Sequence, residues 1–167
     1  MLIRRETPRD IDAIRAVTTA AFNGPVPEAR LVDELRADPG WLPALSLVAV
    51  DSSDAVIGHV VCTRAQVDSA PVLGLGPLSV HPDHHSRGVG SALVHTVLGA
   101  CDALGEPLVV LLGDPGYYHR FGFVLSSEYG ILPPDPAWQP HFQVRPLAAY
   151  TPTIRGTFAY AEPFDRV

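Results

Sequence analysis

Residues that could do chemistry are concentrated in the segment HPDHHSRGVGSALV, residues 81–94. Its imidazole and carboxylate groups are of the type that binds zinc, and they come from His81, Asp83, His84 and His85. The chain has no Cys-x-x-Cys or His-Glu-x-x-His motif, and no second group of ligand residues would complete such a site. We therefore expect no metal here, and the glycines and the arginine become the informative residues.

Two glycines, Gly88 and Gly90, stand at the start of the apolar, helix-like pattern that follows. Glycine inside a helix is less favourable than alanine by about 1 kcal/mol, so its use here needs a reason. One reason is an anion that contacts the backbone, because free N–H groups and the helix dipole attract phosphate to a helix N-terminus. Arg87 and Ser91 would add a guanidinium and a hydroxyl group. The alternative is a turn that needs glycine only for its own conformation.

The segment matches neither of the two common nucleotide-binding loops. A Walker A loop requires Gly-Lys-Ser or Gly-Lys-Thr, and a dinucleotide-binding loop requires Gly-x-Gly-x-x-Gly, and both patterns are absent here. A phosphate bound at this loop should therefore belong to a cofactor of another kind.

The composition limits the class of protein. Of the 167 residues, 47% are hydrophobic and 18% are charged, as expected for one globular domain with an adequate core. The net charge of −6 disfavours a nucleic-acid partner and is compatible with a cationic or neutral substrate. We find no apolar run long enough to cross a membrane and no apolar stretch of a signal peptide, so no membrane partner is expected. Cys62 and Cys101 lie in apolar patterns typical of buried thiols, which favours a cytoplasmic protein.

The periodicity of apolar residues predicts the elements that would position this loop. Helices are predicted after a cap at Thr7 and over 27–37, 87–104 and 115–120. Strands are predicted over 2–5, 45–50, 55–67, 72–80, 107–112 and 142–147, with another that begins at Phe121-Gly122-Phe123. Alternation in the 55–67 strand should place Val56, Val60 and Cys62 on one side and Ile57, Val61 and Thr63 on the other. No linker precedes the proline- and aromatic-rich tail 126–167, so we expect one domain over 1–167 with its core in 1–125.

The predicted strand 72–80 is unusual because Gly74, Gly76 and Pro77 stand in its middle. Proline cannot donate to a strand ladder, and glycine in a strand often marks a bulge or a close backbone approach. We therefore expect an irregular strand directly before the glycine loop.

Two spaced motifs resemble the signatures of one family, the GCN5-related N-acetyltransferases (GNAT). The first is Leu78-Ser79-Val80-His81-Pro82 followed by His85-Ser86-Arg87-Gly88-Val89-Gly90 and Ser91-Ala92-Leu93, which resembles motif A, Gln/Arg-x-x-Gly-x-Gly/Ala after a strand ending in Val-x-Pro. Here His85 stands where the family usually has Gln or Arg. The second is Tyr117-Tyr118-His119-Arg120-Phe121-Gly122-Phe123, which resembles the family's tyrosine four residues before Gly-Phe. A YhbS-like bacterial subgroup is similar also at Gly113-Asp114-Pro115, Phe142-Gln143-Val144 and Gly156-Thr157-Phe158.

The resemblance implies an α/β (α+β) GNAT fold, with a mixed, mostly antiparallel central sheet flanked by helices and with strands that splay around a pantetheine site. It also implies acetyl-CoA, or another acyl-CoA, as cosubstrate, and no metal. On this basis the backbone groups of Leu78, Ser79 and Val80 would bind pantetheine. The loop N–H groups would hold the pyrophosphate, and they belong to His85, Ser86, Arg87, Gly88, Val89, Gly90 and Ser91.

The implied activity is transfer of the acetyl group to a primary amine that attacks the thioester directly. Tyr118 occupies the family's general-acid position and would protonate the departing thiolate; packing against the cofactor is its alternative role. Tyr117 is expected to be a core residue. Glu28 is expected as the base that accepts the amine proton, because the first two helices border the acceptor site in this family. His81 is the second candidate, and a purely structural role is the alternative for both.

Other classes of function are compatible with these residues. The chain could be a non-catalytic module that binds acyl-CoA, as a sensor or a partner subunit. A toxin-type acetyltransferase acting on aminoacyl-tRNA is disfavoured by the negative charge and by the lack of a basic stripe. We expect a small-molecule or protein amine as acceptor and no nucleic-acid partner, and the sequence is compatible with a monomer or a homodimer.

Overall fold

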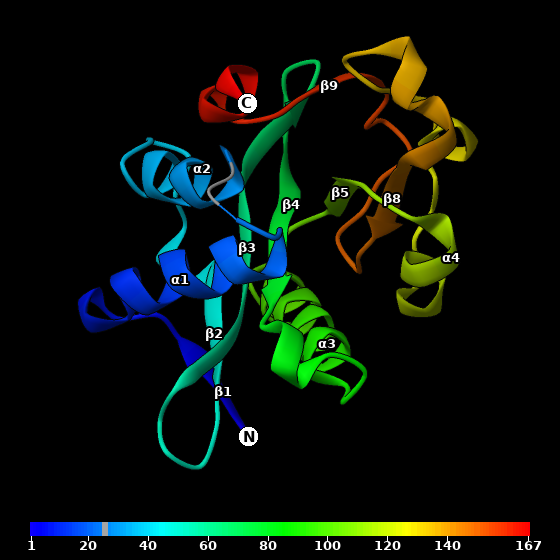
Figure 1. The fold of residues 1–167 in the computed structure, drawn as a ribbon. Coiled ribbons are helices and arrows are strands. Elements are labelled where there is room, and N and C mark those ends of the chain that lie inside the picture. The colour runs from blue at the N-terminus through cyan, green and yellow to red at the C-terminus, as the bar shows by residue number, and fades with distance from the viewer. Residues whose placement is uncertain (25–26) are drawn as a thin grey trace.

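The computed structural model describes residues 1–24 and 27–167, which fold around one mixed sheet (Figure 1). The sheet order is β1-β2-β3-β4-β5-β8-β6, and β9 pairs with both β3 and β7. The strands are β1 (Leu2–Arg5), β2 (Ser46–Val50), β3 (Val56–Val67), β4 (Ala70–Val80), β5 (Leu108–Leu112), β6 (Val124–Leu125), β7 (Ile131–Leu132), β8 (Phe142–Pro146) and β9 (Gly156–Ala159). The helices are α1 (Ile11–Ala21), α2 (Pro27–Arg36), α3 (Val89–Ala103) and α4 (Pro115–Tyr118). Within the described chain only β4–β5 and β7–β9 are parallel, which confirms the predicted mixed, mostly antiparallel sheet.

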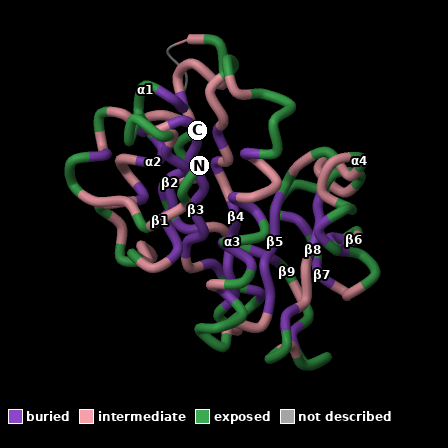
Figure 2. The backbone as a smooth tube through the Cα atoms, turned by 90° about the horizontal axis from the view of Figure 1, so that it is seen from below, coloured by how far each residue is buried: buried purple, intermediate pink, exposed green. Residues whose placement is uncertain are grey.

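The helices cover both faces of the sheet. Successive residues of a strand point to opposite faces, and those of β2 belong to two different core clusters. One cluster joins β2 to α1 and α2 through Val48, Val50, Ile14 and Val32. The other joins β2 to α3 through Leu47, Ala49, Leu93 and Val97. α1 and α2 therefore pack on one face and α3 on the other, and Figure 2 shows the buried residues gathered along the central strands.

A β-bulge corrects the predicted sides of the long strand β3. Ala49 pairs with Gly58, but the next residue, Val50, pairs with Val56, so Ile57 is an extra residue in the ladder. As a result Val56 packs with the cluster under α1 and α2, whereas Ile57 joins Val60 and Cys62 under α3. Simple alternation had placed Val56 with Val60 and Cys62.

Three predicted element ends move for identifiable reasons. The third helix begins at Val89 and not at Arg87, because Gly88 precedes it in the left-handed conformation with φ 79°. Leu104, predicted as the last residue of this helix, lies just beyond its end at Ala103 and is 55% exposed. The strand expected from Phe121 begins only at Val124, because Gly122 ends a 3₁₀ turn with φ 86°.

The tail is built into the sheet. β8 pairs along the whole of β5, and β9 pairs with the far end of β3. The C-terminal 3₁₀ segment Glu162–Arg166 returns to α2, where Phe164 packs against Leu31, Leu35 and Ala161. Figure 1 shows this C-terminal segment beside α2 although the two are far apart in sequence. The tail can therefore contribute residues to a site that α2 borders.

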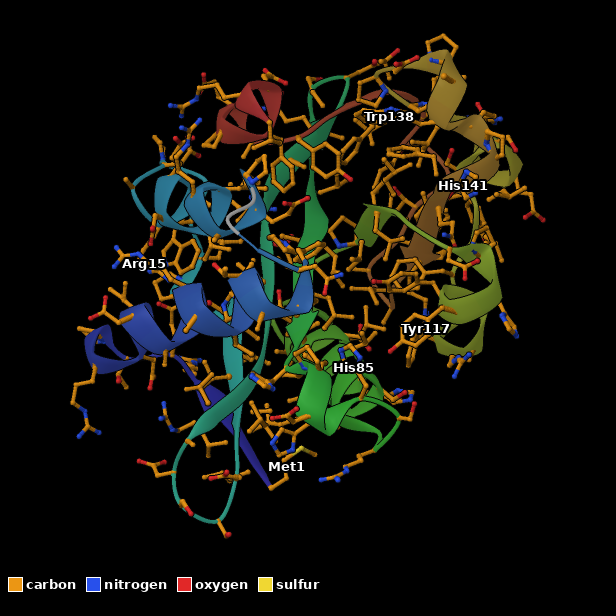
Figure 3. All side chains as sticks on the ribbon, viewed as in Figure 1. Met1, Arg15, His85, Tyr117, Trp138 and His141 are labelled. Atoms are coloured by element: carbon orange, nitrogen blue, oxygen red, sulfur yellow. The ribbon has the colours of Figure 1, made fainter. Side chains whose placement is uncertain are left out.

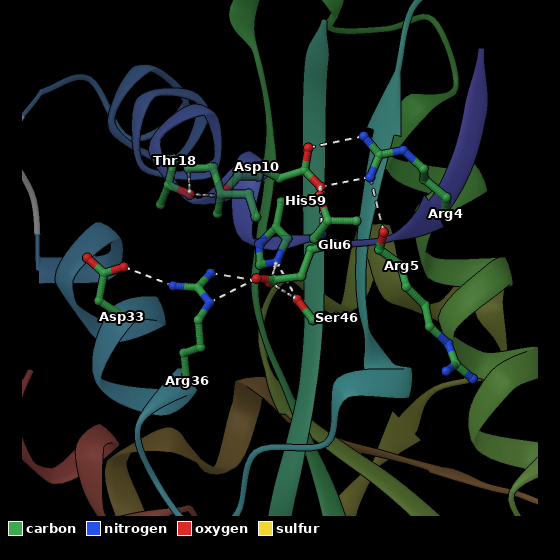
Figure 4. Close-up of polar contacts among 12 residues, drawn as sticks. Arg4, Arg5, Glu6, Asp10, Thr18, Asp33, Arg36, Ser46 and His59 are labelled. Atoms are coloured by element: carbon green, nitrogen blue, oxygen red, sulfur yellow. Dashed lines mark hydrogen bonds and ion pairs between the residues drawn. The ribbon is translucent and has the colours of Figure 1, made fainter. Parts of the chain in front are cut away.

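A buried polar network ties the N-terminal strand to α2 (Figure 4). The Glu6 carboxylate accepts hydrogen bonds from Arg36 and from Ser46, and the Ser46 hydroxyl lies 2.8 Å from His59 Nε2. Burial alone would raise the pKa of Glu6, but hydrogen bonds from His59, Arg36 and Ser46 outweigh it and lower that pKa to about 2. Complete burial lowers the pKa of His59, so its imidazole is neutral in the fold. In the described part of the chain, no helix is long and apolar enough to cross a membrane.

Candidate active site

The site begins where β4 leaves its neighbours. Val60 of β3 pairs with Leu78, but Cys62 pairs with Leu75, so Gly76 and Pro77 form the predicted irregularity. On the other side, β4 pairs with β5 only at Leu73 and Gly74, and the two strands then diverge (Figure 1). The splayed strands predicted from the family resemblance are therefore present.

The ladder decides which backbone groups of β4 face this gap. His81 N–H donates to Ile57 O of β3 at 2.9 Å, and alternate residues of an antiparallel strand bond to the same neighbour. Ser79 therefore directs its backbone groups toward β3, whereas Leu78 and Val80 direct theirs into the gap. The Ser79 side chain is also turned inward, 1% exposed, with its hydroxyl 3.4 Å from that of Thr18. Of the three residues predicted to bind pantetheine through the backbone, only Leu78 and Val80 have their backbone groups on the gap side.

The glycine loop presents a run of free amide groups. In the described chain, the N–H groups of residues 86 to 91 donate no hydrogen bond, while Ala92 N–H already donates to Gly88 O at 3.0 Å. Ser86 and Gly88 are in the left-handed conformation, with φ of 61° and 79°, and such alternation turns successive N–H groups toward a common point. These groups open the 15-residue helix α3, so the helix dipole adds to their attraction for an anion.

His85 differs from the rest of the predicted loop. Its N–H donates to Pro82 O at 3.2 Å, so this amide is already engaged. Its imidazole Nε2 lies 2.9 Å from Val80 O, on the gap side of β4. The side chain at the position where the family usually has Gln or Arg therefore closes the end of β4.

Gly90 lies in close contact with Tyr117. A Cβ atom at residue 90 would lie 2.8 Å from the Tyr117 hydroxyl, closer than real Cβ contacts allow. Tyr117 had been predicted to be a core residue; its ring does pack on the core, but its hydroxyl reaches the glycine loop. Figure 3 shows Tyr117 near His85, and both line the same hollow. The contact with Tyr117 is therefore a second reason for a glycine at residue 90, beside the phosphate predicted from the sequence.

That hollow has a volume of about 650 Å³ and is lined by the loop, the end of β4 and α4. Ser86, Gly88, Val89, Gly90 and Ser91 all contribute to it. Its cation is Arg120, whose guanidinium stands 4.7 Å from the centre of the Tyr117 ring and whose Nε donates to Tyr117 O. Arg87, the cation predicted from sequence, is exposed and does not line the hollow. Sequence reasoning missed Arg120, although it stands inside the second motif.

A second hollow, of about 590 Å³, continues from the first, because Phe22 and Leu78 line both. It passes between the diverging strands, along residues 75–78 of β4, residues 111–112 of β5 and Gly113, to the first two helices and the tail. We call the two hollows together the groove. The described tail residues that line it are Pro134, Trp138, Phe158, Ala159, Tyr160, Phe164, Asp165 and Val167. Of these residues only Phe158 stands in a segment quoted for the resemblance, Gly156-Thr157-Phe158, and no motif indicated that any of them lines a cavity.

Tyr118 lines the second hollow at the diverging strands. Its ring lies against Gly113, where a Cβ atom would stand only 2.7 Å from the ring, and against Phe121 and Phe123. Burial raises the pKa of the Tyr118 phenol to about 12, and Tyr117 adds to the shift. The phenol is therefore neutral at physiological pH and available as a hydrogen-bond donor.

Glu28 and His81, the two residues predicted as candidate bases, lie in different places. Glu28 lines the second hollow, and its Oε2 atom is enclosed without a hydrogen-bond partner among the described residues. His81 lines a separate hollow beside Arg4 and Arg9, and its Nδ1 accepts a hydrogen bond from Asp83 N–H at 3.1 Å. The structure thus brings Glu28 and Tyr118 to one cavity and keeps His81 out of it. Across residues 1–24 and 27–167, no three His, Cys, Asp or Glu side chains gather as metal ligands would.

Comparisons with known proteins agree with this geometry. Residues 2–126 match the family model described as "Acetyltransferase (GNAT) domain". The chain is 36% identical over 169 residues to the Escherichia coli N-acetyltransferase YhbS, covering 99% of both chains. The crystal structure of E. coli YhbS in complex with CoA superposes with a TM-score of 0.92 at 34% identity, covering 99% of this chain and 92% of that one.

A GNAT family acetyltransferase from Brucella melitensis in complex with acetyl-CoA has a TM-score of 0.81 at 35% identity, covering 98% of this chain and 97% of that one. The family model covers most of the chain, and the similar proteins match the chain over nearly its full length. The chain therefore belongs to the GCN5-related family of N-acetyltransferases.

Proposed function

We propose that this protein transfers an acetyl group from acetyl-CoA to a primary amine by direct attack of the amine on the thioester. The observation that carries the proposal is the run of N–H groups at residues 86–91 that have no partner among the described residues, at the mouth of a gap between two diverging strands. The CoA and acetyl-CoA complexes of the two similar proteins support the same cosubstrate.

The pyrophosphate of acetyl-CoA would bind the amides of residues 86–91. Unpaired amides at a helix N-terminus attract phosphate through hydrogen bonds and through the helix dipole. Arg120 would supply the positive charge, because its guanidinium lines the same hollow. Arg87 lies farther out and would act through longer-range attraction, which salt screens.

The pantetheine arm would run along the backbone groups of Leu78 and Val80, which β3 leaves unpaired. The Leu78 N–H is the donor best placed to stabilise the negative charge that develops on the thioester oxygen during attack. A donor fixed in a strand needs no reorganisation as that charge appears, which makes it effective. The Val80 carbonyl already contacts His85 Nε2, so pantetheine would share or displace that contact.

Glu28 would accept the proton that the amine must lose before it attacks. Its enclosed Oε2 atom lines the same cavity as Tyr118 and the β4 irregularity. An ammonium group would satisfy that atom on binding, and proton transfer to the carboxylate would then leave the neutral amine.

Tyr118 would assist departure of CoA. Its pKa of about 12 is about 3.5 units above the ordinary value near 8.5 of a thiol, so complete proton transfer to the thiolate is unfavourable by roughly 5 kcal/mol. A hydrogen bond from the neutral phenol to the sulfur is favourable, however, and strengthens as negative charge develops. The nitrogen loses its second proton to solvent as the amide forms, and the thiolate takes a proton from solvent. The products are then the amide and the CoA thiol, with the first amine proton on Glu28.

Release of free thiol from acetyl-CoA, measured across a panel of amines, tests the proposal. The chain contains no lysine, so acetylation of its own side-chain amines cannot contribute to the signal. Amine-dependent release with formation of the acetylated amine supports an enzyme. Tight binding of acetyl-CoA without release for any amine would instead favour a non-catalytic acyl-CoA-binding module.

A further inference from the structure

We call the second hollow, where the first two helices and the tail meet, the acceptor end of the groove, and its side chains carry negative charge. Among the described residues that line the second hollow, the ionisable ones are Glu28, Asp165, Tyr118 and Tyr160, and none is arginine, lysine or histidine. Burial raises the pKa of both tyrosines, so they are neutral at physiological pH. A ligand here meets two carboxylates and no described cation.

The rest of the acceptor end is apolar and largely aromatic. The rings come from the end of α1, from the tail and from the C-terminal segment, and they belong to Phe22, Trp138, Phe158, Tyr160 and Phe164. Tyr160 stacks on Phe164 with ring centres 4.2 Å apart, and Phe158 meets Tyr160 edge-on at 4.7 Å. These packed rings form a preorganised wall, and ring faces attract cations as well as apolar groups.

Glu28 supplies the polar contact within this wall. Its Oε2 atom is buried and has no donor among the described residues, and leaving a buried carboxylate oxygen unpaired is costly. A ligand that donates a hydrogen bond at this point would remove the cost. An ammonium group does so and also neutralises the charge.

We propose that the acceptor is a small primary monoamine with an apolar, aromatic-sized body and with no carboxylate or phosphate group. This inference rests on the proposed function, because it assigns the end of the groove near Leu78 and Tyr118 to the thioester. The ammonium group then lies at Glu28 and the body lies among the rings of Trp138 and Tyr160. An anionic substituent would face Glu28 and Asp165 with no described cation to pair it.

The size of the groove fits this class. The second hollow has a volume of about 590 Å³, within the range of roughly 300–1,000 Å³ that is usual for small-molecule sites. Part of this space belongs to the thioester, so the remainder suits one aromatic body.

Three amines with one body test the class of acceptor. 2-Phenylethylamine carries no anion, phenylalanine adds a carboxylate at the neighbouring carbon, and phenylalaninamide replaces that carboxylate by a neutral group of similar size. With saturating acetyl-CoA, we expect kcat/KM for 2-phenylethylamine to exceed that for phenylalanine by at least about 100-fold. The kcat/KM for phenylalaninamide should come close to that for 2-phenylethylamine, because the site disfavours the negative charge of the carboxylate and not its size.

Two variants locate the effect in the groove. Trp138→Ala should raise KM for 2-phenylethylamine about tenfold and leave KM for ethylamine nearly unchanged, since ethylamine has no body to contact the ring. Asp165→Asn should improve the relative use of phenylalanine by about threefold, a small effect because Asp165 is exposed. Asp83→Asn, which removes an exposed carboxylate that lines neither hollow of the groove, is the matched control and should change neither quantity.

Failure of this inference and failure of the proposed function give different results. Equal or better use of phenylalanine than of 2-phenylethylamine would overturn the acceptor class while leaving acetyl transfer intact. So would acetylation of spermidine or a peptide N-terminus with none of 2-phenylethylamine. Absence of acetyl-CoA binding by calorimetry would overturn the proposed function itself, and the acceptor class with it.

Discussion

Replacing Gly90 by alanine should separate the two reasons for a glycine at the start of α3. The new Cβ would lie 2.8 Å from the Tyr117 hydroxyl and 3.6 Å from Val80, so the tyrosine must move by about half an ångström. Such overpacking typically costs about 1–3 kcal/mol, which offsets the gain of up to about 1 kcal/mol from alanine in a helix. Gly90→Ala should therefore leave the free energy of unfolding unchanged or lower it by as much as about 2 kcal/mol.

Tyr117→Phe removes the oxygen that the new Cβ would meet. In that background Gly90→Ala should raise the free energy of unfolding by up to about 1 kcal/mol, since only the helix propensity remains. The family motif accepts alanine at this position, so the test of the phosphate site needs a larger side chain. Gly90→Val in the Tyr117→Phe background should lower the affinity for acetyl-CoA at least tenfold, because its branched side chain stands where phosphate approaches the backbone.

Urea unfolding of the four proteins of the alanine double-mutant cycle measures stability, and calorimetric titration of these proteins and of the valine variant measures the affinity for acetyl-CoA. Gly99→Ala is the matched control, because Gly99 lies later in α3 with no atom within 4 Å of its Cβ position. It should stabilise the fold by about 1 kcal/mol and leave binding unchanged. If Gly90→Val in the Tyr117→Phe background binds acetyl-CoA as tightly as Tyr117→Phe alone, the glycine serves only the tyrosine and the phosphate argument is wrong.

Four further predictions concern other groups. Tyr118→Phe should lower kcat about 10- to 100-fold with little change in acetyl-CoA affinity, as expected for loss of one hydrogen bond to a charged group; an unchanged kcat where chemistry is rate-limiting would show that the ring only packs. Glu28→Gln should lower kcat/KM about 100-fold at pH 7, and the deficit should shrink toward pH 10, where a much larger fraction of the free amine is neutral; a deficit independent of pH would exclude a role as base. Arg120→Gln should weaken acetyl-CoA binding about tenfold and Arg87→Gln less than threefold at the same ionic strength; the reverse order would remove Arg120 from the phosphate site. The pKa of Glu6, about 2 in the fold and about 4.5 when exposed, gives stability that is complete above pH 4.5 and is lost as the pH falls toward 2. Between these limits the wild type should lose about 3 kcal/mol more than Glu6→Gln in denaturant titrations, and equal losses would contradict the assigned network.

The glycine loop could be predicted because its signals are local. Gly88 and Gly90 precede a clear helical pattern, and Gly76 and Pro77 interrupt a strand, so the loop and the irregular strand follow from neighbouring residues. The side of Ile57 could not be predicted in this way. One extra residue in a ladder reverses every side chain beyond it, and nothing in the sequence of β3 marks that residue.

The acceptor end of the site depends on contacts between distant residues. β9 has four residues and is held by pairing with β3, about ninety positions earlier, so its own sequence carries a weak strand signal. Trp138 stands in the 3₁₀ segment directly before β8, which pairs with β5, and Phe164 reaches the groove through the return of the C-terminal segment to α2. Periodicity also could not show that Arg120, and not Arg87, lines the hollow at the glycine loop, because the positions of both side chains depend on how α4 packs against the loop.

Amide-resolved hydrogen exchange of the ¹⁵N-labelled protein, with and without saturating acetyl-CoA, tests the central claim most directly. The N–H groups of residues 86–91 donate no hydrogen bond within the described chain, so they should exchange rapidly in the free protein. Acetyl-CoA should slow exchange at these amides and at Leu78 by at least about tenfold, while Ser79, which is buried and faces β3, changes little. Saturation by acetyl-CoA with exchange at residues 86–91 unchanged would contradict the assignment of this loop as the phosphate site.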